Sequence, residues 1–290
     1  MQSRGMSWAI GALVAVFVAG AGWLVWQRFA PPPTSPSVPP VSAPTAQGVP
    51  ARTEPTTGAE SPAIQHPVDE LAVASAPAAS GPPSASAGDP VLDSLTTLLG
   101  REALLRFVNT DGLVRRVVAT VDNLAREQAP SRLWPVVPSP GRLELSTRDG
   151  QTVLADSNAA RHEPFVRFAE SVDLPSAAAW YVRHYARFQS AYEELGFPGR
   201  YFNDRMVAVV DHLLATPEPQ GPVAVRLPEV QGPVQPARPW VMYEYADPAL
   251  QRLSAGQKLL LRVSPDQRAR LKLRLVQWRE LVTARAGTSR

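Results

Sequence analysis

Cysteine is absent from the 290 residues of this chain, and lysine is nearly absent. Without cysteine the chain has no disulfides and no thiolate ligands for a metal. Apart from Lys258 and Lys272 the basic residues are arginines, and the net charge is only +3. So small a positive charge, spread over the whole chain, gives weak support for nucleic-acid binding. We therefore expect no nucleic-acid partner.

Familiar catalytic and cofactor motifs are missing as well. The sequence contains no G-x-x-x-x-G-K-[ST] loop, no G-x-S-x-G, no H-E-x-x-H and no dinucleotide fingerprint. His184 and His212 fall on two helices expected to be neighbours. A zinc site between them, or a base formed by His212 with Asp211, is the weaker alternative because a site needs converging ligands. We expect neither a cofactor nor a metal.

Aromatic residues are absent from residues 31–88, which consist mostly of Pro, Ala, Ser and Thr. Such a composition cannot bury enough apolar surface to offset the entropy lost on ordering. Proline also favours the extended polyproline II conformation, at about 3.1 Å per residue. We expect residues 31–88 to form a disordered linker that holds a folded domain away from the N-terminal segment.

Charge is lacking from residues 5–27, GMSWAIGALVAVFVAGAGWLVWQ. As a helix this stretch would extend about 34 Å, which is enough for a hydrocarbon core of about 30 Å. Trp8 near one end and Trp23 and Trp26 near the other fit the two interfacial belts. We expect residues 1–30 to form a transmembrane anchor, with the amino terminus in the cytoplasm and the rest of the chain outside.

Small residues in the same stretch allow two further interpretations. Ala19-Gly20-Ala21 has the A-x-A form that a signal peptidase cleaves, so a removed signal peptide is the main alternative to an anchor. Gly11, Ala15 and Ala19 recur every four residues. Such a row of small residues would allow a weak homodimer through the transmembrane helix.

Residues 89–290 have the apolar periodicity of a mainly α-helical domain. Asp149-Gly150, which follows the alternating Leu143 and Leu145, predicts a small β-hairpin. We expect about six to seven helices. One begins at Asp89, and the others span residues 111–126, 163–172, 175–195, 200–215, 248–263 and 264–287.

The last of these helices has the clearest start. Ser264 is the expected N-cap and Pro265 the first helical residue. Basic residues lie mostly off its apolar stripe; they are Arg268, Arg270, Lys272, Arg274 and Arg279. We interpret them as a solvated face, with anionic lipid headgroups or an acidic partner as the alternative.

An aromatic stripe follows the helix expected at residues 175–195. It consists of Tyr181, Tyr185, Phe188, Tyr192 and Leu195. A bend then leads to the next helix, whose first turn holds Asn203, Asp204 and Arg205. Because buried phenols need hydrogen-bond partners, we expect this triplet to satisfy the tyrosines or to form a polar floor beside them. In particular, we expect Asp204 to accept from backbone N–H groups or a phenol, and Arg205 to pair with a carboxylate.

These residues form the candidate site. Its members are Tyr181, Tyr185, Tyr192, Tyr201, Asn203, Asp204 and Arg205. A structural role is favoured over a ligand site, because aromatic stripes more often form core than pocket. The alternatives are a hydrolase that uses the triplet, or a glycan binder in which tyrosines and Trp240 stack on sugar faces. No catalytic residue can be assigned.

Two long stretches resemble a known family. They are YARFQSAYEELGFPGRYFNDRMVAVVDHLLATPEP, residues 185–219, and VMYEYADPALQRLSAGQKLLLRV, residues 241–263. Both resemble the domain of unknown function 3014 family, and LRFVNTDGLVRRVVATVDNLAR, residues 105–126, is similar to its N-terminal segment. The resemblance covers most of residues 89–283. It implies a bacterial envelope protein and supplies no catalytic residues.

Taken together, these features favour a single-pass protein of the bacterial inner membrane with its C-terminal domain in the periplasm. A non-enzymatic binding or scaffolding module is the leading hypothesis. The alternative is an envelope hydrolase or a peptidoglycan-binding module. The expected partners are the inner membrane and an envelope protein or glycan.

Overall fold

The computed structural model describes residues 63–71, 89–228 and 243–285. Within these ranges the chain is mainly helical, with ten α-helices and two small antiparallel sheets. The helices are α1 (Pro90–Leu99), α2 (Arg101–Phe107), α3 (Leu113–Leu124), α4 (Asn158–Ser171), α5 (Leu174–Arg183), α6 (Tyr185–Glu194), α7 (Phe202–Leu214), α8 (Pro248–Gln251), α9 (Ala255–Leu261) and α10 (Pro265–Thr283). The strands are β1 (Leu145–Arg148), β2 (Gln151–Leu154), β3 (Val225–Arg226) and β4 (Glu244–Tyr245).

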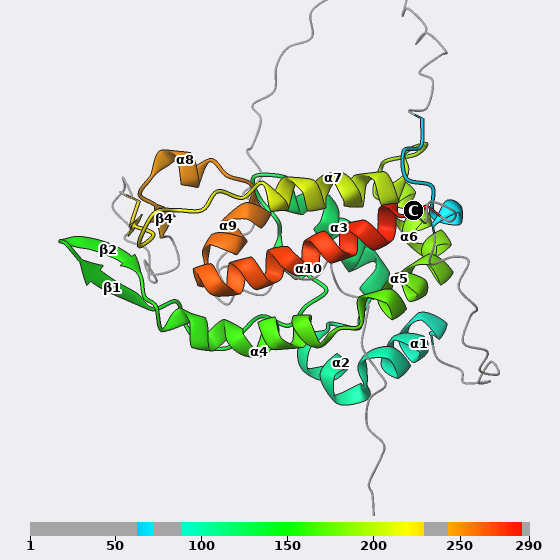
Figure 1. Cartoon of the computed structure of the whole chain (residues 1–290), viewed down its shortest axis with the longest axis horizontal. Helices are drawn as coiled ribbons and strands as arrows, with labels where there is room; N and C mark the ends of the chain where they lie inside the picture. Colours follow the sequence, from blue (N-terminus) through cyan, green and yellow to red (C-terminus); the bar gives the residue numbers. More distant parts are fainter. Residues whose placement is uncertain (1–62, 72–88, 229–242, 286–290) are drawn as a thin grey trace, which may run out of the picture.

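The long helix α10 crosses the middle of the molecule, with α7 on one side of it and α4 on the other (Figure 1). Helix α3 packs against α6, α7 and α9, and α5 packs against α10. Leu275, Trp278 and Val282 are buried residues of α10 in the main hydrophobic core. The core therefore runs along α10 and continues to α3 through α7.

More helices form than the sequence predicts, because α2 is an addition and two predicted helices are divided. Gly100, with a φ of 77°, ends α1, and α2 begins directly after it. The helix predicted over residues 175–195 is interrupted at His184, where φ is −102° and ψ is 9°. The segment 248–263 is divided before Ser254, whose capping box starts α9.

The start of α10 agrees with the sequence prediction. Ser264 is the N-cap, its hydroxyl accepts from the backbone N–H of Gln267 at 3.2 Å, and Pro265 is the first helical residue. In turn, Gln267 Oε1 accepts from the backbone N–H of Ser264, which completes a capping box.

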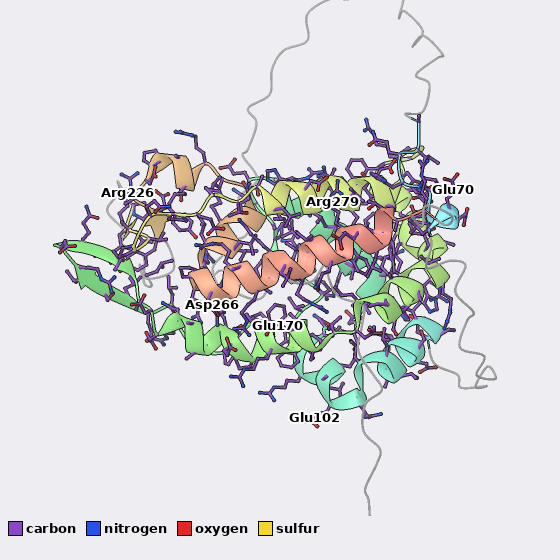
Figure 2. The ribbon with its side chains drawn as sticks, viewed as in Figure 1. Glu70, Glu102, Glu170, Arg226, Asp266 and Arg279 are labelled. Carbon is purple, nitrogen blue, oxygen red and sulfur yellow. The ribbon has the colours of Figure 1, made fainter. Side chains whose placement is uncertain are left out.

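Four of the five basic residues predicted on this face of α10 form ion pairs within the fold, and Arg274 donates to the backbone oxygen of Val172, so the prediction of a solvated face is wrong. The pairs are Arg268–Glu218, Arg270–Glu163, Arg270–Glu170, Arg270–Asp266, Lys272–Glu218 and Arg279–Asp211. Figure 2 labels Glu170 on α4 and Asp266 at the start of α10, the two helices that Arg270 joins. Asp266 lies four residues before Arg270 on the same helix, but the other acidic partners come from distant parts of the sequence, about which helical periodicity carries no information.

The predicted hairpin is present. Strands β1 and β2 pair with Leu145 opposite Leu154 and Arg148 opposite Gln151. Asp149 and Gly150 between them have positive φ values of 51° and 76°. Positive φ at both central residues is what a type I′ turn requires, and the Asp-Gly sequence suits it.

A short segment of the predicted linker belongs to the fold. Residues 63–71, which we call the docked segment, lie beside the C-terminal end of α10 (cyan in Figure 1) and include the 3-10 helix η4 (Val68–Glu70). Val68 and Leu71 are each 1% exposed and join the main core. The prediction of a disordered linker is therefore wrong for residues 63–71.

The predicted anchor, residues 1–30, lies outside the described residues, as do Trp240 and most of the linker. None of the helices in the part of the chain that the structure describes is long and apolar enough to cross a membrane.

Candidate functional site

The candidate cluster surrounds the first turn of α7, which a different helix caps. Tyr201 is the N-cap residue, yet its side chain makes no capping bond. Instead, Gln189 Oε1 accepts from the backbone N–H of Phe202 at 2.9 Å, and the Tyr185 hydroxyl accepts from that of Asn203 at 3.2 Å. Two N–H groups that the helix leaves without internal partners are thereby satisfied by α6. The side chains at the start of α7 are held in place by these bonds.

The bend between α6 and α7 depends on two glycines. Gly196 and Gly199 have φ values of 107° and 72°, which side-chain-bearing residues rarely adopt. Between them Phe197 stacks on Tyr192, with ring centroids 4.7 Å apart. Tyr192 is buried in this packing, between Phe197 and Phe202, and no hydrogen bond joins it to Asn203 or Asp204 in the part of the chain that the structure describes.

Asn203 is the centre of the cluster and is completely buried. Its Oδ1 accepts from the Tyr181 hydroxyl at 3.3 Å. Its Nδ2 donates to the backbone oxygen of Val282 at 3.0 Å and to that of His66 at 2.9 Å. One amide thus joins α5, α10 and the docked segment.

Asp204 and Tyr201 bind the backbone of the docked segment. The Asp204 carboxylate accepts from the N–H groups of Gln65 and His66, at 3.0 and 2.8 Å. The Tyr201 hydroxyl accepts from the N–H of Val68 at 2.8 Å. The sequence prediction that Asp204 accepts from backbone N–H groups is met, although those groups belong to another part of the chain.

Arg285 holds the docked segment from the other side. Its Nη2 donates to the backbone oxygen of Gln65 at 3.4 Å, and its Nε lies 3.6 Å from a carboxylate oxygen of Glu70. Leu71 forms an isolated antiparallel bridge with Arg285. We call Tyr201, Asn203, Asp204 and Arg285 together the clamp.

Arg205 points away from the clamp. Its Nε donates to Asp122 Oδ1 at 3.0 Å and its Nη2 to the backbone oxygen of Asp122 at 2.8 Å. The carboxylate partner predicted for Arg205 therefore exists, but it lies on α3. Arg126 also donates to Asp122, at 2.5 Å.

Two tyrosines of the cluster, Tyr181 and Tyr185, are protonated at ordinary pH. Burial raises the pKa of Tyr181 and of Tyr185 well above the usual value for a phenol, and neighbouring tyrosines add to the shift. Each therefore keeps its proton and donates it, Tyr181 to Asn203 and Tyr185 to Gln189 Oε1 at 3.1 Å. Neither hydroxyl is suited to act as a base.

The structure brings together most of the predicted site residues, and it adds partners that sequence reasoning missed. The converging residues are Tyr181, Tyr185, Tyr201, Asn203 and Asp204. The missed partners are Gln65, His66, Val68, Val282 and Arg285. The sequence does distinguish the docked segment from the rest of the linker, since Ile64 and Leu71 are the one isoleucine and the one leucine of residues 31–88.

The contacts that hold the docked segment can be compared with the cost of ordering it. Burying a Val or Leu side chain returns about 1.5–3 kcal/mol, and a net hydrogen bond about 0.5–1.5 kcal/mol. Ordering the backbone of each residue costs about 1–2 kcal/mol. The stabilisation from two buried side chains and five hydrogen bonds thus offsets the entropy cost of ordering residues 65–71. The two sides are of the same order of magnitude.

The histidines expected to approach each other do not. His184 Nε2 lies 2.9 Å from the Ser94 hydroxyl, and His212 Nε2 lies 2.9 Å from the Ser254 hydroxyl. Asp211 is paired with Arg279 rather than with His212. Among the described residues, no group of three or more His, Cys, Asp or Glu is placed to hold a metal ion.

His162 is a third, buried histidine with a defined tautomer. Its Nε2 lies 3.1 Å from Arg161 Nη2, and its Nδ1 lies 3.3 Å from the Ser139 hydroxyl. A guanidinium can only donate, so Nε2 accepts and Nδ1 carries the proton. In this state His162 cannot take a proton from Ser139. Burial, with Arg161 and Arg262 nearby, lowers the pKa of His162 to about 4.

This pKa predicts a loss of stability in mild acid. The unfolded value is 6.5, so between pH 6.5 and 4 the unfolded chain binds more protons and acidification favours it. We expect His162 to account for about 2–3 kcal/mol of destabilisation across that window. Urea unfolding of the full chain and of His162→Gln at pH 7 and 4.5 measures it. Taking the difference between the two proteins cancels the pH dependence contributed by other groups, such as Glu163, whose pKa Arg270 lowers to about 2. Parallel pH curves would refute the prediction.

An open cleft lies elsewhere on the domain, with a volume of about 750 Å³. It is lined by the start of α1, the turn before α3 and one face of α6. Two ion pairs cross its rim, Arg115–Glu194 at 2.8 Å and Arg187–Asp89 at 2.7 Å. None of the predicted site residues lines this cleft.

The fold and the clamp define a helical domain that binds a short segment of its own chain through backbone hydrogen bonds. The family described as "Protein of unknown function (DUF3014)" matches residues 113–279, and the chain belongs to this family. The matched range runs from the start of α3 into α10 and confirms the resemblance found in residues 185–219 and 241–263. No curated protein and no solved structure matches the chain.

Proposed function

We propose that this chain is a non-enzymatic binding or scaffolding module of the bacterial cell envelope. In this proposal residues 5–27 anchor it in the inner membrane, and the helical domain lies in the periplasm. The anchor is supported by an uncharged stretch long enough to span a bilayer and flanked by tryptophans. The long Pro-rich linker supports a domain held at a distance from the membrane.

One observation carries the proposal of a binding role over a catalytic one. Both carboxylate oxygens of Asp204 accept backbone N–H groups of the docked segment. Asn203 is completely buried, and its side-chain amide makes hydrogen bonds with three partners. The polar groups that a hydrolase would need for chemistry are engaged in holding a peptide.

The sugar-stacking alternative receives less support from the same geometry. Tyr181 and Tyr192 are buried in the core, and a buried ring cannot stack on a glycan. Trp240 lies outside the described residues.

Membrane topology is the first experimental test. Two fusions after Gly88 are compared in cells, one to a reporter that is active only in the periplasm and one to a reporter that is active only in the cytoplasm. We expect activity from the periplasmic reporter alone, because the charge-free stretch is followed by a polar linker and then the domain. A matched fusion that lacks residues 5–27 should reverse the result. Activity of the cytoplasmic reporter on the intact segment would contradict the proposal.

A further inference from the structure

Apart from the exposed Arg285–Glu70 ion pair, the contacts between the clamp and the docked segment do not depend on which polar side chains the segment carries. The hydrogen bonds from Tyr201, Asn203 and Asp204 all engage backbone N–H or C=O groups, as does the one from Arg285 Nη2. Backbone recognition of this kind accepts any peptide that adopts the same conformation, including the 3-10 turn of Val68–Glu70. It resembles the way in which a binding groove holds a ligand more than the way in which a core holds a side chain.

Apolar side chains supply the sequence preference. Val68 and Leu71, three residues apart, are buried in the main core, whereas Asp69 and Glu70 between them are exposed. Pro67 precedes the first buried residue and follows the two N–H groups that Asp204 binds. A peptide with these backbone groups and with two apolar side chains at the same spacing would make the same contacts.

The contacts that orient the clamp side chains on α7 come from other helices, not from the docked segment. Tyr185 and Gln189 of α6 cap the first turn of α7 and thereby orient Asn203 and Asp204. Tyr181 and the backbone oxygen of Val282 hold the Asn203 amide. None of these contacts involves residues 63–71, so Asn203 and Asp204 are positioned independently of the docked segment.

We propose that the clamp is a recognition site for a peptide that forms the same short 3-10 turn, and that residues 63–71 occupy it in the resting chain. A peptide segment of an envelope partner, with the same backbone groups and two apolar side chains three residues apart, displaces them. This inference rests on the proposed binding function and names the class of partner. Pro-, Ala- and Ser-rich stretches flank the docked segment on both sides in the sequence, so its release also lengthens the tether between the anchor and the domain.

The test measures peptide binding by the full chain in detergent. In one variant, residues 63–71 are replaced by nine Gly and Ser residues, which empties the clamp and keeps the linker length. The probe is a fluorescent peptide with the sequence of residues 61–73, SPAIQHPVDELAV. We expect it to bind the replaced chain and to bind the unmodified chain at least tenfold more weakly, since the attached segment competes at an effective concentration on the order of 1 mM.

Two controls identify the contacts. A peptide that carries V68D and L71D should bind the replaced chain at least tenfold more weakly. Asp204→Ala in the replaced chain should weaken the normal peptide, whereas Glu194→Ala, at the rim of the distant cleft, should leave its binding unchanged. Equal binding of both peptides, or no binding to a replaced chain that keeps its helical circular dichroism, would overturn the proposal.

A second measurement covers the case in which the replaced chain does not fold. A specific protease site is placed within residues 72–88 of the otherwise unmodified chain, and the protein is cut after folding. We expect the N-terminal fragment to dissociate and to exchange with the fluorescent peptide. A fragment that stays bound without exchange would show a permanent part of the fold and would refute the inference. Both assays use purified protein, so a failure here is distinct from a failure of the topology reporters.

Discussion

Asp122→Ala is expected to lower the free energy of unfolding by about 3 kcal/mol, because it leaves a partly buried arginine without its counter-charge. The Asp122 side chain is 4% exposed, and its carboxylate accepts from Arg205 of α7 and from Arg126. Arg205 is 29% exposed and keeps its bond to the backbone oxygen of Asp122, which limits the loss. Urea unfolding of the full chain in detergent at pH 7 measures the change.

Glu194→Ala is the matched control for this prediction. The Arg115–Glu194 pair also joins α3 to a neighbouring helix at 2.8 Å, but its side chains are 78% and 54% exposed. Exposed pairs contribute about 0–1 kcal/mol, since water and salt screen both charges. Similar losses in the two variants would contradict the view that burial makes Asp122 important.

Local features of the fold could be predicted from the sequence because their causes are local. Asp149 and Gly150 both tolerate positive φ, and they form the turn of the β1–β2 hairpin. Ser264 and Pro265 have the chemistry of an N-cap and a first helical residue, and α10 begins there. In each case the deciding residues are neighbours in the chain.

Long-range partners could not be predicted in the same way. Helical spacing indicated that Arg268 and Arg270 lie off the apolar stripe of α10, but it could not show that Glu218 and Glu163 lie opposite them. The need of Arg205 for a carboxylate was foreseen, yet its partner Asp122 is 83 positions away. One sequence without an alignment holds no direct record of such pairs.

The docked segment was missed for a compositional reason. Averaged over residues 31–88, the sequence is too poor in large apolar residues to fold. Within it, Val68 and Leu71 enter a core that other helices have already built. Ordering therefore depends on a groove formed elsewhere, and the segment's own average composition cannot show it.

Asn203→Leu is expected to lower the free energy of unfolding by about 3 kcal/mol, since it leaves several buried polar groups without partners. Leucine has a similar size but offers neither a donor nor an acceptor to the Tyr181 hydroxyl or the backbone oxygens of Val282 and His66. Chemical denaturation of the full chain in detergent gives the value. Tyr181→Phe removes one of these bonds, at 3.3 Å, and should cost about 1 kcal/mol.

The size of the Asn203 effect distinguishes a structural amide from a ligand contact. Asp204 is only partly buried and bonds to the docked segment alone, so Asp204→Ala should cost no more than the release of that segment. Asn203 also joins α5 to α10, and its loss therefore weakens the core itself. In the chain whose residues 63–71 are replaced, Asp204→Ala should have almost no further effect, whereas Asn203→Leu should keep most of its own. If both substitutions became neutral there, Asn203 would serve only the docked segment, and its role in the core would be refuted.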